Sequence, residues 1–167
     1  ITNTIEVGSL DFMPGLVEAT GEEGKGWTYT DGVFSPPEVD LTALKAAKTD
    51  AVNTERYSRI YMASIPYTFP GDEDPDGIQM RDETDRQNIQ DFVIDAQMKD
   101  PEATMYFMPV SNSVKTMTPA QAMAMGAYLK ARGDLIMGYS WTLKAQIAGA
   151  ETLEDLNGID ITSGWPE

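Results

Sequence analysis

The chain has 167 residues, 12 of them basic and 27 acidic, and its net charge of −15 disfavours binding to nucleic acid or to an anionic membrane surface. Hydrophobic residues make up 41% of the chain, which is enough for the folded core of about one domain. Cysteine and histidine are both absent, which excludes disulfides, thiolate chemistry, histidine general bases and the usual zinc ligands.

Residues 1–37 are predicted to form a small β unit. Short β-type runs are separated by Gly and Asp, and the stretch GWTYTDGVFSPP places a favoured hairpin turn pair, Asp31-Gly32, between two aromatic runs. The double proline that follows ends the second strand. A unit of this size barely supports a core of its own, so we expect it to dock on the rest of the chain or on another subunit.

Three aromatic residues of this unit are the candidate partner-binding residues: Trp27, Tyr29 and Phe34. As exposed side chains they could dock a strand or an apolar face of a partner. The alternative is that they form the small core of the β unit itself.

Residues 38–66 are predicted to be a linker helix. Asp40 is a plausible N-cap, a partial apolar stripe runs from Leu41 to Ile60, and Pro66 marks the end.

Residues 67–150 are predicted to be an α+β domain of a few short antiparallel strands packed with two or three helices. An extended run at Tyr67 and Phe69 is expected to pair with residues 77–80, and strands are expected near 103–110 and 114–117. Between them, Thr84 with Gln87 resembles the capping box of a helix with an apolar face.

The strongest helix boundary in the chain is Thr118-Pro119-Ala120-Gln121, a capping box with proline at the first helical position. A long helix rich in Ala and Met is predicted to follow, to about residue 148. Its small residues allow close helix approach, either in the domain centre or on a neighbouring subunit. Residues 151–167 are predicted to be a tail with one short helical turn.

The acidic stretch GDEDPDGIQMRDE, residues 71–83, matches the calcium-loop pattern D-x-[DN]-x-[DN]-G-x5-E. Two prolines lie where the entering helix of an EF-hand should be, and Asp-Pro-Asp-Gly is also typical of a β-turn. We therefore predict no metal site and no cofactor. If Ca²⁺ does bind, its candidate ligands are Asp72, Asp74, Asp76 and Glu83.

A cluster of carboxylates, Asp82, Glu83, Asp85 and Asp91, lies beside two arginines. A carboxylate pair could serve acid–base hydrolysis, whereas acidic residues at a helix N-terminus also arise from charge complementarity with the helix. Because no nucleophile motif accompanies the cluster, no catalytic residue is predicted.

The motifs together resemble a group of small tailed-bacteriophage proteins associated with tails or tail fibres. The resemblance rests first on the N-terminal element G-W-x-Y-x-x-G-x-F-x-P-P, here Gly26 to Pro37. It rests also on the Pro66-Tyr67-Thr68-Phe69 run, the Gly77-Ile78-Gln79 segment and the helix that begins at Thr118-Pro119, in a region that resembles a C-terminal domain of unknown function.

The resemblance implies a non-enzymatic structural component of the phage tail, in the fibre, baseplate or tail tip, which acts by protein–protein packing. Its partners would be other fibre or baseplate subunits in a homo- or hetero-oligomer, with no nucleic acid and no membrane. Its location would be the virion tail, and the host cytoplasm during assembly. Two alternatives are an assembly chaperone for tail fibres and a carboxylate-based or calcium-dependent hydrolase.

Overall fold

A computed structural model describes residues 27–30, 33–35 and 39–166. The chain divides into two compact units, Ile1–Asp40 and Leu41–Glu167. In the first unit, β1 (Thr28–Thr30) pairs antiparallel with β2 (Val33–Ser35), and Tyr29 lies opposite Phe34. The pairing agrees with the predicted hairpin, whose turn residues Asp31 and Gly32 lie outside the described residues.

The second unit is a mixture of helices and short antiparallel hairpins, so the predicted α+β class is confirmed. The elements in chain order are α1 (Leu41–Ile60), β3 (Met62–Tyr67), β4 (Asp76–Met80), α2 (Glu83–Met98), β5 (Met105–Phe107), β6 (Lys115–Met117), α3 (Pro119–Gly149) and α4 (Leu153–Gly158). β3 pairs with β4, and β5 pairs with β6.

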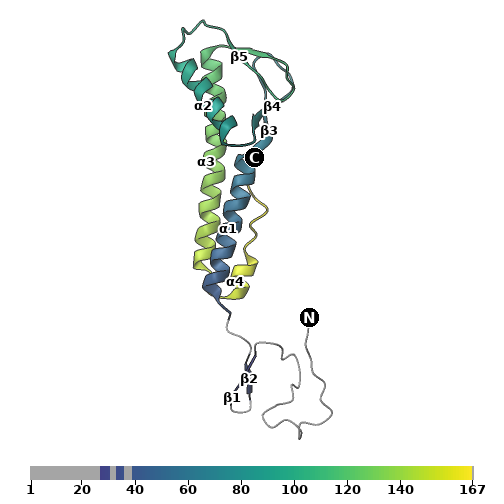
Figure 1. The fold of residues 1–167 in the computed structure, drawn as a ribbon, viewed down its shortest axis with the longest axis vertical. Helices are drawn as coiled ribbons and strands as arrows, with labels where there is room; N and C mark the ends of the chain where they lie inside the picture. The colour runs from purple at the N-terminus through teal and green to yellow at the C-terminus, as the bar shows by residue number, and fades with distance from the viewer. Residues whose placement is uncertain (1–26, 31–32, 36–38, 167) are drawn as a thin grey trace. The chain divides into compact units, whose positions relative to one another are not determined.

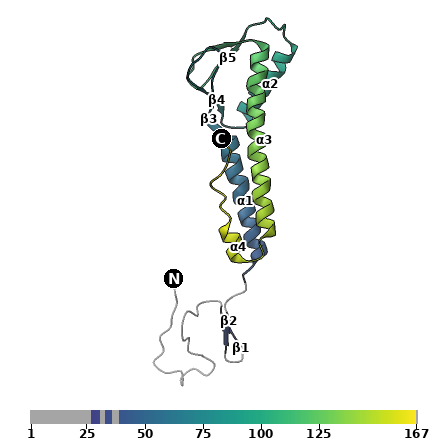
Figure 2. The same ribbon diagram turned by 180° about the vertical axis from the view of Figure 1, so that it is seen from behind.

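The central element is α3, whose 31 residues make a helix about 46 Å long. Its N-terminal half lies beside α2 and the hairpins, and its C-terminal half lies beside α1, with α4 at the far end (Figures 1 and 2). One stripe of α3 is buried along the whole helix: Ala122, Met125, Leu129, Arg132, Ile136, Ser140, Leu143 and Ile147. Spacings of three and four keep these residues on one face.

The stripe joins the two larger hydrophobic cores, one toward each end of α3, and a third, small cluster contains Ala96, Met105 and Ala122. The first core lies between α3, α2 and the β3–β4 hairpin, and its buried members include Ile65, Phe69, Ile78 and Met125. The second core joins α3 to α1, α4 and the C-terminal segment: Val52, Ile136, Leu143, Ile147, Ala150, Leu156 and Trp165. α3 therefore holds both halves of the unit together.

The helix expected as a linker over 38–66 is instead part of the second unit. α1 ends at Ile60, because residues 62–67 form β3, and it packs along α3 with Val52 fully buried. The boundary between the two units therefore falls after Asp40, before the helix rather than after it. The stripe that predicted the helix is not the buried surface as a whole: Leu44 and Ala51 are exposed, and the buried residue of α1 is Val52.

The segment expected as a tail, 151–167, is also packed through residue 166. After α4, residues 159–166 run back along α1 (Figures 1 and 2). Trp165 is 7% exposed, its Nε1 donates to the Ile161 carbonyl at 2.8 Å, and its ring contacts that of Tyr139. Arg59 of α1 donates to the Thr162 carbonyl at 2.8 Å.

Of the helix caps predicted at Thr118 and Thr84, the structure confirms the first and corrects the second. At α3, Thr118 Oγ1 accepts from the Gln121 amide at 3.3 Å, and the Thr118 amide donates to Gln121 Oε1 at 2.8 Å. At α2, the N-cap is Asp82 rather than Thr84. Asp82 has extended backbone, and its side chain accepts from the Asp85 amide at 3.0 Å.

Candidate functional site

The acidic loop that matches the calcium pattern forms the turn between β3 and β4. Asp76 belongs to β4, and Lys115, from β6, places its Nζ 2.8 Å from a carboxylate oxygen of Asp72 and 4.0 Å from one of Asp76. Ser111 Oγ donates to Asp76 at 2.5 Å, and this bond, with one from the Gly77 amide, lowers the pKa of Asp76. An ammonium group and a hydroxyl thus contact two of the candidate ligands.

The fourth candidate ligand lies apart from the loop, at the start of α2. Glu83 accepts a hydrogen bond from the Tyr61 hydroxyl at 2.6 Å and another from Arg86 Nε at 2.7 Å. Arg86 and Tyr61 lower the pKa of Glu83 to about 2. Within the described ranges, no group of three or more acidic side chains is placed to hold a metal ion, so Asp72, Asp74, Asp76 and Glu83 are not brought together.

The carboxylate cluster at the start of α2 consists of capping and ion-paired groups. Asp85 accepts from Arg81 Nε at 2.7 Å, and hydrogen bonds from Arg81 lower the pKa of Asp85 to about 2. Asp91 accepts a hydrogen bond from Nε2 of the Gln87 side chain at 2.8 Å. Glu83 and Asp85 are therefore held ionised at neutral pH, whereas a carboxyl that donates a proton in catalysis needs a raised pKa.

The three aromatic candidates for partner binding lie in the first unit. Trp27 is half-buried and precedes β1, Tyr29 lies in β1, and Phe34 lies opposite it in β2. The side chains of Tyr29 and Phe34 fall outside the described part of the structure. Their role as partner-binding residues stays a prediction.

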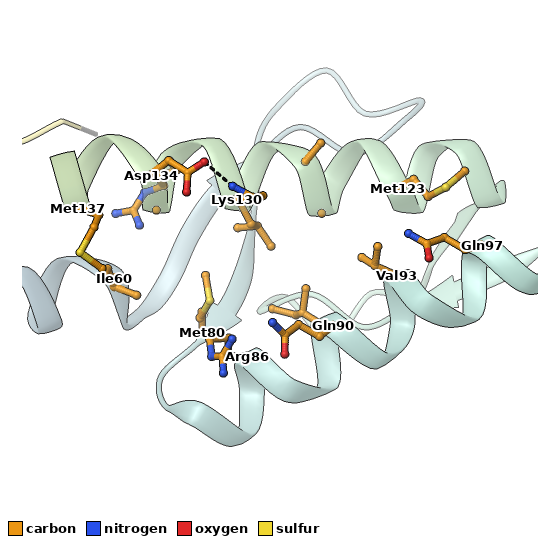
Figure 3. Close-up of a pocket in the computed structure, with 16 residues that line it drawn as sticks. Ile60, Met80, Arg86, Gln90, Val93, Gln97, Met123, Lys130, Asp134 and Met137 are labelled. Atoms are coloured by element: carbon orange, nitrogen blue, oxygen red, sulfur yellow. Dashed lines mark hydrogen bonds and ion pairs between the residues drawn. The ribbon is translucent and has the colours of Figure 1, made fainter.

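A groove of about 630 Å³ lies between α2 and α3, beside the end of α1. Its walls are largely apolar, and polar side chains from both helices line its sides: Arg86, Gln90 and Gln97 from α2, and Lys130 and Asp134 from α3. Figure 3 shows Lys130 and Asp134 on α3 facing Arg86 and Gln90 across the groove. This volume is typical of small-molecule sites.

Arg132 of α3 also lines this groove and is only 8% exposed. Its Nη2 donates to the Arg59 carbonyl at 2.8 Å and contacts the sulfur of Met62 at 3.0 Å. Within the described part of the chain, no carboxylate forms an ion pair with it. Burial lowers the pKa of Arg132, but an arginine stays charged at neutral pH. The groove thus contains a largely buried cation.

A second unusual surface is the side of α3 that faces solvent, which we call the outer face of α3. Most of its exposed residues are uncharged: Ala120, Ala124, Ala127, Tyr128, Ala131, Leu135, Thr142, Ala145 and Gly149. The exposed charged residues of α3 are Lys130 and Asp134, which form an ion pair with each other. Leu135 is 59% exposed, and nearby Trp141 is 64% exposed. Exposed helix faces are normally polar, and a helix that is apolar on all sides is normally buried.

The model of a family described as a domain of unknown function, DUF4376, matches residues 43–163. The chain belongs to the DUF4376 family. The match begins two residues into α1 and ends beyond α4, so the family domain corresponds to the second unit. No curated protein and no solved structure matches the chain significantly. Among the described residues, no helix is long and apolar enough to cross a membrane.

Sequence reasoning missed the groove and Arg132. The groove exists only because α2 and α3 lie side by side, and nothing local in the sequence fixes that arrangement. One signal was present: Arg132 occupies a position of the buried stripe, three residues after Leu129 and four before Ile136. A charged residue at a buried position needs a partner or a function.

Proposed function

We propose that this DUF4376 protein is a structural component of a bacteriophage tail and acts by packing against other tail subunits. The observation that carries the proposal is the outer face of α3, where Leu135 and Trp141 are exposed on a helix whose exposed charges are limited to the Lys130–Asp134 ion pair. Exposed apolar surface of this kind marks protein–protein contacts. The resemblance of the sequence to tail-associated proteins is the reason for proposing a phage tail as the assembly in which these contacts form.

The amount of surface indicates how a partner would bind. A strip about 46 Å long and roughly 10 Å wide offers roughly 450 Å², about half of what one partner contributes to a standard interface. Further apolar side chains lie exposed on α1, where Leu44 is 40% and Tyr57 is 57% exposed. A stable contact would therefore extend beyond α3.

The net charge of −15 bears on the choice of partner. Two strongly acidic surfaces repel each other, so contact with another acidic subunit is least costly where both surfaces lack charge. The outer face of α3 comes close to that condition, because the exposed charges of this helix, Lys130 and Asp134, pair with each other. Large apolar residues at its edges then supply the contact area.

Quantitative mass spectrometry of purified phage particles tests the proposal. We expect the protein in particles at a fixed copy number, and a Leu135→Glu variant should be depleted from particles while remaining soluble in the cell. Gln146→Glu introduces the same charge on an exposed position of α3 and is the control. Absence from particles would contradict the proposal. If the protein instead raises the yield of soluble fibre without entering particles, it is an assembly chaperone.

A further inference from the structure

We propose that the groove between α2 and α3 binds a small amphiphilic monocarboxylate, whose carboxylate pairs with the guanidinium of Arg132 and whose apolar tail lies along the groove. This inference is independent of the proposed role in a phage tail. It rests on three observations: unused donors on a buried guanidinium, an excess of cations in the lining, and an open apolar channel beside them.

The guanidinium of Arg132 has donors to spare. Nη2 contacts the Arg59 carbonyl and the Met62 sulfur, while Nε and Nη1 have no acceptor among the described residues. No described side-chain nitrogen that is fully buried lacks a partner, so both atoms retain some accessible surface. Because Arg132 lines the groove, a carboxylate in the groove could meet the planar fork of donors that arginine presents.

The charges around the groove leave this cation uncompensated. Arg86 is paired with Glu83, and Lys130 is paired with Asp134 at 2.5 Å, which is the one carboxylate in the groove lining. Arg132 therefore remains without a counter-ion among the described residues. In a chain with a net charge of −15, a site that favours an anion stands out from its surroundings. Because Arg132 is the one cation of the groove lining without a counter-ion among the described residues, the groove favours a ligand with a single negative charge.

The shape of the groove favours an apolar tail. Beyond Arg132, the lining is supplied mainly by hydrophobic side chains, among them Ile60, Met80, Ile89, Val93 and Leu129. On α3, Gly133 leaves the channel open, because a Cβ at this position would meet nothing within 4 Å. Figure 3 shows Met80 and Val93 on the side opposite α3.

A purely structural role for Arg132 is the competing explanation. Its bond to the Arg59 carbonyl satisfies a backbone acceptor at the end of α1, where a cation is also favoured by the helix dipole. That role uses one nitrogen and would produce no preference for anions in the groove. Ligand selectivity therefore distinguishes the two explanations, whereas protein stability does not.

Isothermal titration of the full chain with matched eight-carbon probes tests the proposal. We expect octanoate to bind at least about tenfold more tightly than octan-1-ol, and octylamine more weakly still. From hexanoate to decanoate, affinity should rise about fourfold for each added methylene, as expected when the tail is buried. No octanoate binding at millimolar concentration, or equal binding of octanoate and octan-1-ol, would overturn the proposal.

Two variants connect this selectivity to the groove. Arg132→Met should reduce the preference for octanoate over octan-1-ol to about twofold or less. Gly133→Leu adds a side chain to the groove at a position where a Cβ meets nothing within 4 Å, and it should weaken both probes at least about tenfold. Lys99→Met, at the end of α2 and outside the groove lining, is the control and should change neither. Octanoate binding that survives Gly133→Leu would place the site elsewhere and contradict the proposal.

Discussion

The guanidinium of Arg132, in the middle of α3, donates a hydrogen bond to the carbonyl oxygen of Arg59, one residue before the end of α1, at 2.8 Å. On α3, Arg132 lies between Leu129 of the first core and Ile136 of the second. It caps a carbonyl that has no partner within its own helix. The bond joins two helices of the same unit through residues that are 73 positions apart in the chain.

Arg132→Met should lower the free energy of unfolding by about 1–3 kcal/mol, because it removes a hydrogen bond from a charged donor and leaves the Arg59 carbonyl without a partner. Urea denaturation measures the change. Lys130→Met removes an exposed ion pair from the same helix and should cost less than about 1 kcal/mol. If both variants lose the same stability, the bond does not help to hold α1 against α3.

The contact between α2 and α3 depends on a glycine. A Cβ at Gly126 would lie 2.6 Å from Val93 Cγ2, so Gly126→Ala must displace the Val93 side chain or α2 itself and should cost about 1–3 kcal/mol. Gly133→Ala, one heptad later, meets open space and should stabilise the helix by about 0.5–1 kcal/mol. Opposite signs in thermal unfolding are expected. A stabilising Gly126→Ala would show that the helices are less closely packed than described.

Two tryptophans test whether the C-terminal segment belongs to the fold. Trp165→Ala should cost about 3–5 kcal/mol, because it removes a buried ring that packs on Tyr139 and lies under the Arg59 guanidinium. Trp141→Ala removes an exposed ring and should change stability by no more than about 0.5 kcal/mol. Chemical denaturation followed by circular dichroism compares them. Equal, small losses would mean that residues 159–166 do not pack on α1 and α3.

Acid should weaken the start of α2. The pKa of Glu83 falls from its ordinary value of 4.5 to about 2 in the folded chain, because Arg86 and Tyr61 bind the ionised form. The stability from Glu83 is therefore complete above about pH 4.5 and is lost as the pH falls through about 2. Melting temperatures measured between these two values should drop, and should drop less in Glu83→Gln.

The control for the acid experiment is Asp91→Asn, on the same helix. It removes a carboxylate that is hydrogen-bonded to the neutral amide of Gln87. The variant should follow the wild-type decline with pH. If the melting temperature declines identically in the wild type and in Glu83→Gln, the hydrogen bonds of Glu83 with Arg86 and Tyr61 do not contribute to the loss of stability in acid.

Sequence reasoning succeeded where the determinants are local. The Thr118–Gln121 box fixes the start of α3 within four residues, and the hairpin of β3 and β4 follows from the acidic turn between two extended runs. The prediction was wrong at the start of α2, where the sequence offers both Asp82 and Thr84 as N-cap residues. Asp82 has the extended backbone of an N-cap residue, and the helix begins directly after it. The box at Thr84 is displaced because the helix has already begun.

The remaining features depend on contacts between distant residues. The calcium pattern in residues 71–83 carries no information about Lys115. The side chain of Lys115 contacts the carboxylate of Asp76, although the two residues are 39 positions apart. The burial of Trp165 depends on Tyr139 and Arg59, and the groove depends on the side-by-side packing of α2 and α3. The DUF4376 match covers Asp76, Lys115 and both helices of the groove, and it ends two residues before Trp165.

Cross-linking mass spectrometry of purified phage tails tests the central claim most directly. An amine-reactive cross-linker should join Lys130, whose side chain is exposed beside the outer face of α3, to another tail protein or to a second copy of this chain. Lys99, at the end of α2, provides the comparison on the same unit. We predict intermolecular links at Lys130 that exceed those at Lys99. Tails that contain no peptide of this protein would contradict the account.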